Sequence, residues 1–166
     1  MKARRLVLVR HAKAAWAQGA AVDFDRPLAP RGERDADALA LWFADHLPRP
    51  SAIVASSAPR AHDTAVRMTA AWADAPAITL EPDLYEAPLD GPARLVAEFP
   101  DDWESAVVVG HNPSISHAAD WFIGEPTVVD LPPGGMIWME FDADHWRDIA
   151  PGRARVVAVR VPERIA

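Results

Sequence analysis

The stretch Leu6-Val-Leu-Val-Arg-His-Ala-Lys13 joins four β-prone apolar residues directly to Arg10, His11 and Lys13. A continuous apolar run of this kind is typical of a strand that is covered on both faces of its sheet. In an open α/β sheet, ligands bind beyond the carboxyl ends of the strands, which is where Arg10 and His11 would lie. The stretch therefore predicts a buried strand that delivers a cation and an imidazole to a ligand site.

The rest of the chain alternates short apolar runs with amphipathic segments. We expect further strands at 51–55, 77–80 and 106–109, and helices at 32–47, 59–73, 91–99 and 114–123. Two alternating runs near the end, 135–141 and 155–161, predict a hairpin-like pair. This order predicts an α/β fold, a three-layer α/β/α sandwich with a mixed, mostly parallel central sheet. No linker or repeat divides the sequence, so residues 1–166 are expected to form a single domain.

The composition limits the classes of function. The 166 residues include 17 Lys plus Arg and 24 Asp plus Glu, and the net charge of −7 disfavours general binding of nucleic acid or of an anionic membrane. The chain has no Cys, which excludes a disulfide framework, a thiol nucleophile and a Cys-based metal site. No apolar run approaches the about 20 residues of a membrane-spanning helix. We therefore expect a cytoplasmic protein with no nucleic-acid or membrane partner.

The other predicted strands are also followed by polar side chains. Arg60 lies shortly after the second strand, Glu86 after the third, and His111 almost directly after the fourth. Together with Arg10 and His11, they would bring two His, two Arg and one Glu to one edge of the sheet. No Gly-rich loop follows the first strand, so neither a dinucleotide fingerprint nor a Walker loop is present.

This set of side chains suits the transfer of a phosphoryl group through histidine. A neutral imidazole is a nucleophile near pH 7, and an Arg guanidinium presents paired donors to phosphate oxygens. A second imidazole, protonated, would offset the charge of the transferring group. A carboxylic acid could protonate the leaving group and later activate water.

Five segments together resemble the histidine phosphatase superfamily, whose fold is that of phosphoglycerate mutase. They follow the family's order over roughly residues 5–124: Arg10-His-Ala-Lys13, Asp25-Arg-Pro-Leu-Ala-Pro-Arg-Gly32, Ser56-Ser-Ala-Pro-Arg60 with Asp63-Thr-Ala65, Leu84-Tyr-Glu-Ala87, and Val109-Gly-His-Asn-Pro113. The short chain and the Arg-His-Ala-Lys form are most similar to the small SixA-type phosphohistidine phosphatases. The sequence departs from the family pattern at Ala12, where Gly is commoner, and at Pro59, which directly precedes Arg60.

The resemblance implies a role for each of the five side chains. His11 would be the nucleophile, Arg10 and Arg60 would bind the phosphoryl oxygens, His111 would stabilise charge, and Glu86 would be the proton donor. It implies a phosphatase with a phosphohistidine intermediate, no metal and no organic cofactor. The substrate would be a phosphorylated molecule, with a phosphohistidine-bearing protein favoured.

Other interpretations of the whole chain stay open. The same scaffold could serve a small-molecule phosphomonoesterase, or a phosphate-binding or interaction domain that turns over weakly. A mutase is disfavoured, because the chain lacks room for long insertions that would enclose a sugar acid.

Single residues also allow simpler interpretations. Arg60 could be a surface residue that balances Asp63, Glu86 could be a solvated side chain, and Lys13 suits a rim residue that attracts anions. A metal site built from His11, His62, His111 and His117 is disfavoured, because no His-Glu-x-x-His element or Asp cluster supports it.

Overall fold

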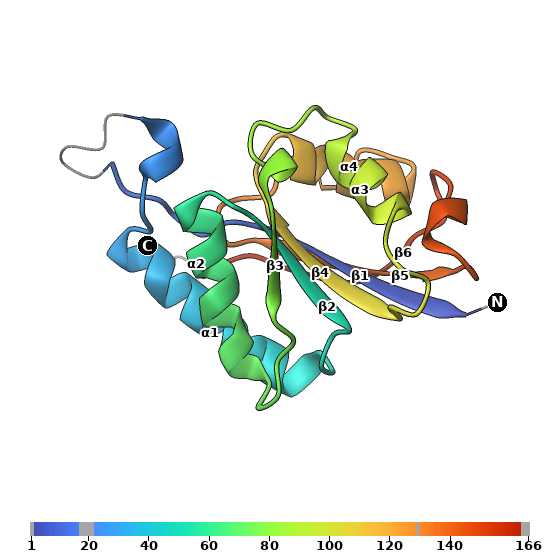
Figure 1. Cartoon of the computed structure of the whole chain (residues 1–166), viewed down its shortest axis with the longest axis horizontal. Coiled ribbons are helices and arrows are strands. Elements are labelled where there is room, and N and C mark those ends of the chain that lie inside the picture. The colour runs from blue at the N-terminus through green and yellow to red at the C-terminus, as the bar shows by residue number, and fades with distance from the viewer. Residues whose placement is uncertain (1, 17–21, 129, 164–166) are drawn as a thin grey trace.

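The apolar run at the start of the chain forms β1, an interior strand of a six-stranded sheet (Figure 1). The computed structural model describes residues 2–16, 22–128 and 130–163. The strands are β1 (Ala3–Arg10), β2 (Ala52–Ser56), β3 (Ile78–Glu81), β4 (Ser105–Gly110), β5 (Met136–Asp142) and β6 (Arg155–Arg160). The α-helices are α1 (Pro30–His46), α2 (Pro59–Met68), α3 (Gly91–Ala97) and α4 (Ser114–Ile123), with short 3-10 turns at Asp23–Asp25, Thr69–Ala71, Pro82–Leu84 and Trp146–Asp148.

The sheet has the order β3-β2-β4-β1-β5-β6 and is mixed. The strands β3, β2, β4 and β1 are parallel to one another, whereas β5 is antiparallel to both β1 and β6. The predicted hairpin-like pair is therefore present as β5 and β6. The prediction of a mixed, mostly parallel central sheet is confirmed.

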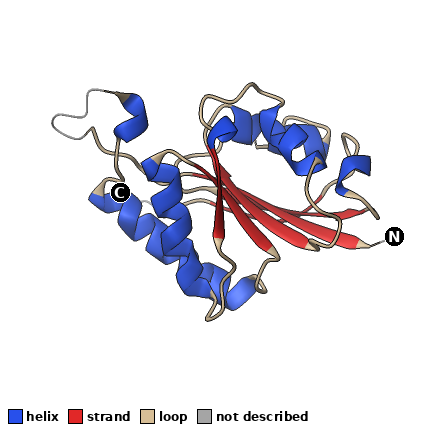
Figure 2. Ribbon diagram, in the orientation of Figure 1, coloured by secondary structure: helices blue, strands red, loops and turns tan. Residues whose placement is uncertain are grey.

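Helices cover both faces of the sheet, which gives the predicted three layers (Figures 1 and 2). The helices α1 and α2 pack on one face, where Leu39, Phe43 and Met68 are fully buried against the strands. The helices α3 and α4 pack on the other face, whose core includes Phe122. Ala36, Leu39, Ala40 and Phe43 form one buried stripe on α1, as their helical spacing predicts.

The second helix is shorter than the sequence predicts. Regular α2 ends at Met68 rather than near residue 73, and a 3-10 turn over Thr69–Ala71 follows it. This turn brings the Trp72 indole onto the Phe43 ring, with centroids 5.7 Å apart, and lets its N–H donate to the Leu47 carbonyl. Packing of one aromatic side chain thus outweighs continued helical periodicity.

No helix in the described part of the chain is both long and apolar enough to cross a membrane.

Candidate active site

The register of the two central parallel strands brings the two predicted histidines together. Arg10 is paired with Gly110 at the carboxyl ends of β1 and β4, and the His11 N–H donates to the Gly110 carbonyl at 3.0 Å. The next residue on each strand is therefore His11 on one side and His111 on the other. Their ring centroids lie 5.0 Å apart, and both residues are buried.

The hydrogen bonds of His11 define its tautomer. Nδ1 lies 2.8 Å from the Ala12 carbonyl oxygen, which can only accept, so Nδ1 carries the proton. Nε2 keeps its lone pair, and the Arg60 Nε–H donates to it at 3.3 Å. Burial above all, with added repulsion from Arg60 and Arg10, lowers the pKa of His11 to about 4. Near pH 7 His11 is thus a neutral imidazole whose unprotonated nitrogen is Nε2.

A cavity of about 290 Å³ opens at this imidazole. Its lining is strongly cationic and comprises Arg10, His11, Lys13, Ala14, Arg26, Arg60, His111, Asn112 and Pro133. The Arg10 Nη1 donates to the Leu131 carbonyl at 2.9 Å, while its Nε is buried without a hydrogen-bond partner among the described residues. Three guanidinium groups and an ammonium beside a neutral imidazole favour an anionic ligand such as a phosphoryl group.

His111 is held by a serine at the end of β2. Its Nε2 lies 2.8 Å from the Ser56 Oγ, and this oxygen already accepts the Ala58 N–H at 3.2 Å. A hydroxyl oxygen can accept two hydrogen bonds and donate one, so this contact orients the ring whichever of its nitrogens carries the proton. The other ring nitrogen, Nδ1, is buried without a hydrogen-bond partner among the described residues.

The expectation of a protonated second imidazole does not hold for the free protein. Burial first, then repulsion from His11 and Arg60, lowers the pKa of His111 to about 3. The imidazole is thus neutral near pH 7 and offers an N–H rather than a full charge. The positive charge beside His11 near pH 7 then comes from the arginines rather than from His111.

Arg60 is buried, and it forms an ion pair with Asp23 rather than with Asp63 on its own helix. Its Nη2 lies 3.0 Å from the Asp23 Oδ2, and its Nη1 donates to the Asp23 carbonyl at 2.9 Å. Asp63, the partner that the sequence favours for a surface arginine, instead pairs with Arg67 at 3.6 Å. The interpretation of Arg60 as an exposed helix residue is therefore wrong.

Asp23 lies in the polar loop before α1, and sequence reasoning missed its part in the site. Its carboxylate accepts from the Tyr85 hydroxyl at 2.8 Å and from the Arg26 Nη1 at 3.0 Å, besides Arg60. The hydrogen bonds from Tyr85, Arg26 and Arg60 lower the pKa of Asp23 to about 2. Arg26 was likewise missed, although it lines the cavity at His11. Arg26 belongs to the sequence motif that begins at Asp25, whereas the signal for Asp23 was its place in a loop that leads into a helix.

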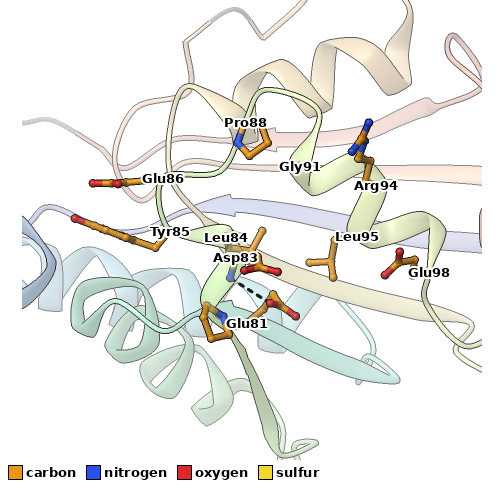
Figure 3. A pocket seen from close by; sticks show the side chains of 11 residues that line it. Glu81, Asp83, Leu84, Tyr85, Glu86, Pro88, Gly91, Arg94, Leu95 and Glu98 are labelled. Carbon is orange, nitrogen blue, oxygen red and sulfur yellow. Dashed lines mark hydrogen bonds between the residues drawn. The ribbon is translucent and has the colours of Figure 1, made fainter.

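Glu86 lies beside the His11 cavity rather than in its lining. It is exposed and adopts a left-handed backbone conformation with φ of 53°, which is uncommon for a residue with a side chain. It lines a second cavity of about 170 Å³ together with Tyr85 and His111. Tyr85 and Glu86 also border a larger groove, but both side chains extend to its outer side, away from Leu95 (Figure 3). Glu86 thus shares the lining of this second cavity with His111, and its role as proton donor stays a prediction.

Of the other positions that the sequence singled out, Lys13 lines the His11 cavity, whereas His62 and His117 do not. Lys13 lies in the lining of the His11 cavity, as expected of a rim cation. His117 borders a different cavity with Trp121 and Arg147, and His62 is absent from the lining of the His11 cavity. Across the described ranges, no group of three or more His, Asp or Glu side chains could hold a metal ion.

Gly32, which ends the loop motif before α1, lies against the main chain of Lys13. A Cβ at Gly32 would lie 2.1 Å from the Lys13 carbonyl oxygen, so only glycine allows α1 to approach this closely. Ala12, by contrast, has room for its methyl group against Leu28, and its N–H donates to the Thr64 Oγ1 at 3.0 Å. The departure from the commoner Gly at Ala12 is therefore accommodated.

The fold and this cavity are those of a phosphatase that uses histidine. The sequence model of the histidine phosphatase superfamily (branch 1) matches residues 6–106, and the chain belongs to this family. An uncharacterized protein of Mycobacterium tuberculosis is 36% identical over 93% of this chain and 99% of its own length. A relative in Mycobacterium leprae is 30% identical with the same coverage.

Solved structures agree with this assignment. A protein of Nakamurella multipartitia assigned as phosphohistidine phosphatase SixA is 30% identical, with a TM-score of 0.84 and 98% of each chain covered. Its counterpart from Agrobacterium tumefaciens is 29% identical, with a TM-score of 0.82 and coverage of 96% of this chain and 98% of that one. A mycobacterial glucosyl-3-phosphoglycerate phosphatase is 19% identical with a TM-score of 0.72 over 94% of this chain and 98% of its own, a likeness of fold alone. The chain is thus a hydrolase of the histidine phosphatase type.

Proposed function

We propose that this phosphatase acts without a metal on phosphohistidine carried by a protein, through a phosphorylated intermediate on His11. One observation carries the proposal: the unprotonated His11 Nε2 accepts from the Arg60 Nε–H, and His11 lines a cavity together with Arg10, Arg26 and Arg60. A neutral nucleophile among guanidinium groups matches the needs of phosphoryl transfer, in which positioning and charge stabilisation dominate.

In the first step, the His11 Nε2 attacks phosphorus in line with the leaving group. The new N–P bond forms as the bond from phosphorus to the leaving atom breaks. The leaving atom takes the electron pair, and it is protonated by solvent or by the predicted donor Glu86. Arg10 and Arg60 would bind the equatorial oxygens, and the His111 Nδ1–H would donate to one of them. In the free protein Arg60 Nε–H already donates to Nε2, so it has only to shift to a phosphoryl oxygen as attack begins.

In the second step, water attacks the phosphoryl group on His11. The N–P bond breaks, its electron pair returns to Nε2, and inorganic phosphate leaves. The hydrogen bond from Nδ1 to the Ala12 carbonyl keeps the ring in one orientation throughout. The imidazole is then neutral and ready for the next cycle.

The choice of phosphohistidine rests on the leaving group and on the similar structures. Imidazole leaves readily, particularly when protonated, whereas an alkoxide needs a proton donor. Glu86, the predicted donor, is exposed and lies outside the lining of the nucleophile's cavity, which suits a substrate that depends little on an acid. The two structures about 30% identical to this chain are both assigned as phosphohistidine phosphatases.

A substrate panel tests this choice. Purified protein is offered phosphohistidine peptides, aryl phosphates and alkyl phosphates, and kcat/KM is measured for each. We expect phosphohistidine peptides to give the highest value. A clear preference for an alkyl phosphate would instead favour a small-molecule phosphomonoesterase on the same scaffold.

Replacement of Glu86 by Gln should separate these substrates further. General acid catalysis contributes typically 10²–10⁴-fold, so hydrolysis of alkyl phosphates should fall by about that factor. Hydrolysis of phosphohistidine and aryl phosphates should fall much less, because their leaving groups need less help. An equal loss on every substrate would assign Glu86 to positioning water or to structure, and no loss on any would mean that another group is the donor.

The titration of His11 offers a test that needs no substrate. Its pKa is lowered to about 4 from the ordinary value near 6.5, so the ring stays neutral down to that lower pH and becomes protonated only below it. The nucleophilic form should therefore persist through the weakly acidic range. Ring ¹⁵N chemical shifts, assigned by comparison with His11→Ala, should show a midpoint near 4. A midpoint near 6.5 would contradict the burial and the cationic surroundings on which the mechanism depends.

A further inference from the structure

The outer end of the Arg60 guanidinium is fixed by one residue from a loop 37 positions away in the sequence. Nη1 donates to the Asp23 carbonyl at 2.9 Å, and Nη2 donates to the Asp23 Oδ2 at 3.0 Å. The inner edge of the same group faces the nucleophile, with Nε 3.3 Å from the His11 Nε2. A guanidinium is planar and rigid, so holding both Nη atoms determines where Nε points.

Asp23 is itself braced from two further sides. The Tyr85 hydroxyl donates to Oδ2 at 2.8 Å, and the Arg26 Nη1 donates to Oδ1 at 3.0 Å. The Tyr85 ring in turn packs edge-on against the His111 ring, with centroids 5.5 Å apart. Rotation of the carboxylate would break contacts to three side chains, each of which borders a cavity of the site.

We propose that Asp23 is the positioning residue of this active site, holding Arg60 so that its Nε edge meets the phosphoryl group transferred to His11. The inference rests on the proposed function in one respect, that Arg60 binds the phosphoryl group. Asp23 acts through Arg60 and not on the substrate, because a carboxylate repels phosphoryl oxygens. Its charge also offsets part of the positive charge of Arg60 and Arg26 in the free protein.

The opposite role for Asp23 is that of a resident anion which competes with phosphate for Arg60. Displacing it would require breaking its hydrogen bonds to Arg60, Arg26 and Tyr85 together, including one through the main-chain carbonyl. These contacts favour a fixed support. The two roles predict opposite signs when the carboxylate is removed, which makes them separable.

Replacement of Asp23 by Asn is the decisive variant, and Asp25→Asn is its matched control. Asp25 lies in the same 3-10 turn, is exposed, and makes no side-chain hydrogen bond or ion pair with another residue in the described ranges, while the change in net charge is identical. Misplacing a catalytic contact by about 1 Å can cost about 10²-fold, so we expect kcat/KM to fall by about 10²-fold in Asp23→Asn. Asp25→Asn should behave as the parent protein does.

Two readouts independent of turnover accompany this comparison. Isothermal titration with inorganic phosphate should show affinity about tenfold weaker in Asp23→Asn, since a charge-assisted contact that aligns the Arg60 donors is lost. The Arg60 Nε–Hε resonance, assigned with Arg60→Ala, should shift or broaden in Asp23→Asn and stay in place in Asp25→Asn. A merely structural role for Asp23 would lower thermal stability but leave both readouts unchanged in the folded variant.

The results can overturn the proposal in several ways. Tighter phosphate binding or faster hydrolysis in Asp23→Asn would make Asp23 a competitor, and behaviour equal to that of Asp25→Asn would remove any role. If Asp23→Asn does not fold, Tyr85→Phe decides, because it removes one brace and keeps the carboxylate. It should weaken phosphate binding in the same direction, and an unchanged affinity would refute the proposal.

Failure of the proposed function would be recognised separately. If His11 of the parent protein is never phosphorylated, the proposed function is wrong. Phosphate titration and the Arg60 resonance still test whether Asp23 positions Arg60. If His11 is phosphorylated but phosphate affinity and the Arg60 resonance are both unchanged in Asp23→Asn, the positioning role alone is wrong.

Discussion

Replacement of His11 by Ala is expected to abolish hydrolysis of phosphohistidine and of phosphate monoesters alike, while the protein stays folded. The variant loses Nε2, the atom that would carry the phosphoryl group, and loss of a nucleophile can lower kcat by about 10⁶-fold. Within the part of the chain that the structure describes, the imidazole donates to the neighbouring Ala12 carbonyl and accepts from the Arg60 Nε–H. Its removal should therefore leave the sheet and both helical layers intact.

Rapid quenching with ³²P-labelled substrate gives the direct measurement. The parent protein should hold a phosphoryl group that is labile in acid and stable in base, and His11→Ala should hold none. His62→Ala is a suitable control, because His62 lies on α2 outside the lining of the nucleophile's cavity. Full activity in His11→Ala, or label retained by that variant, would refute the assignment of the nucleophile.

The strand ends were the part of the site that the sequence could predict. The carboxyl ends of parallel strands all lie at one edge of the sheet. The residues that directly follow neighbouring parallel strands must therefore lie at that same edge. His11 and His111 therefore had to meet once β1 and β4 were adjacent, and Arg10 comes with them. The same logic explains why Ser56, at the end of β2, reaches His111.

Contacts made by loops could not be predicted in this way. The path from Asp23 to Arg60 depends on how the segment before α1 folds over the sheet edge, and no periodicity constrains it. A sequence shows an aspartate three residues after Arg60 and suggests a local pair, yet Asp63 turns to Arg67. Local spacing on a helix is thus a poor guide when a distant loop competes for the same cation.

Protonation was also beyond the sequence, because it depends on burial. A pair of histidines near arginines suggests one charged ring, but at neutral pH both His11 and His111 stay neutral in the free protein, since burial and neighbouring cations lower the pKa of each. Proximity could be inferred from the strands, whereas the depth of each ring could not. The same applies to Glu86, whose left-handed backbone directs it to the second cavity.

Replacement of Arg60 by Ala should lower kcat/KM by about 10³–10⁵-fold, the range that a single arginine contributes in phosphoryl transfer, and Arg10→Ala should fall in the same range. Arg60 is buried, and its Nε lies 3.3 Å from the His11 Nε2. Steady-state kinetics with an aryl phosphate measure this loss. Arg67→Ala is the control, because Arg67 lies on the same helix and carries the same charge but pairs with Glu33 and Asp37 at the surface.

Arg60→Lys should recover little of this activity, although it restores the charge. The guanidinium meets the Asp23 carbonyl, the Asp23 carboxylate and the His11 Nε2 with three separate nitrogens. An ammonium group is a point donor and cannot span these positions at once. If Lys restored most of kcat/KM, net charge alone would explain the role of Arg60, and the fixed geometry around Asp23 would be without catalytic consequence. A loss in Arg67→Ala as large as in Arg60→Ala would instead attribute both effects to damage of α2.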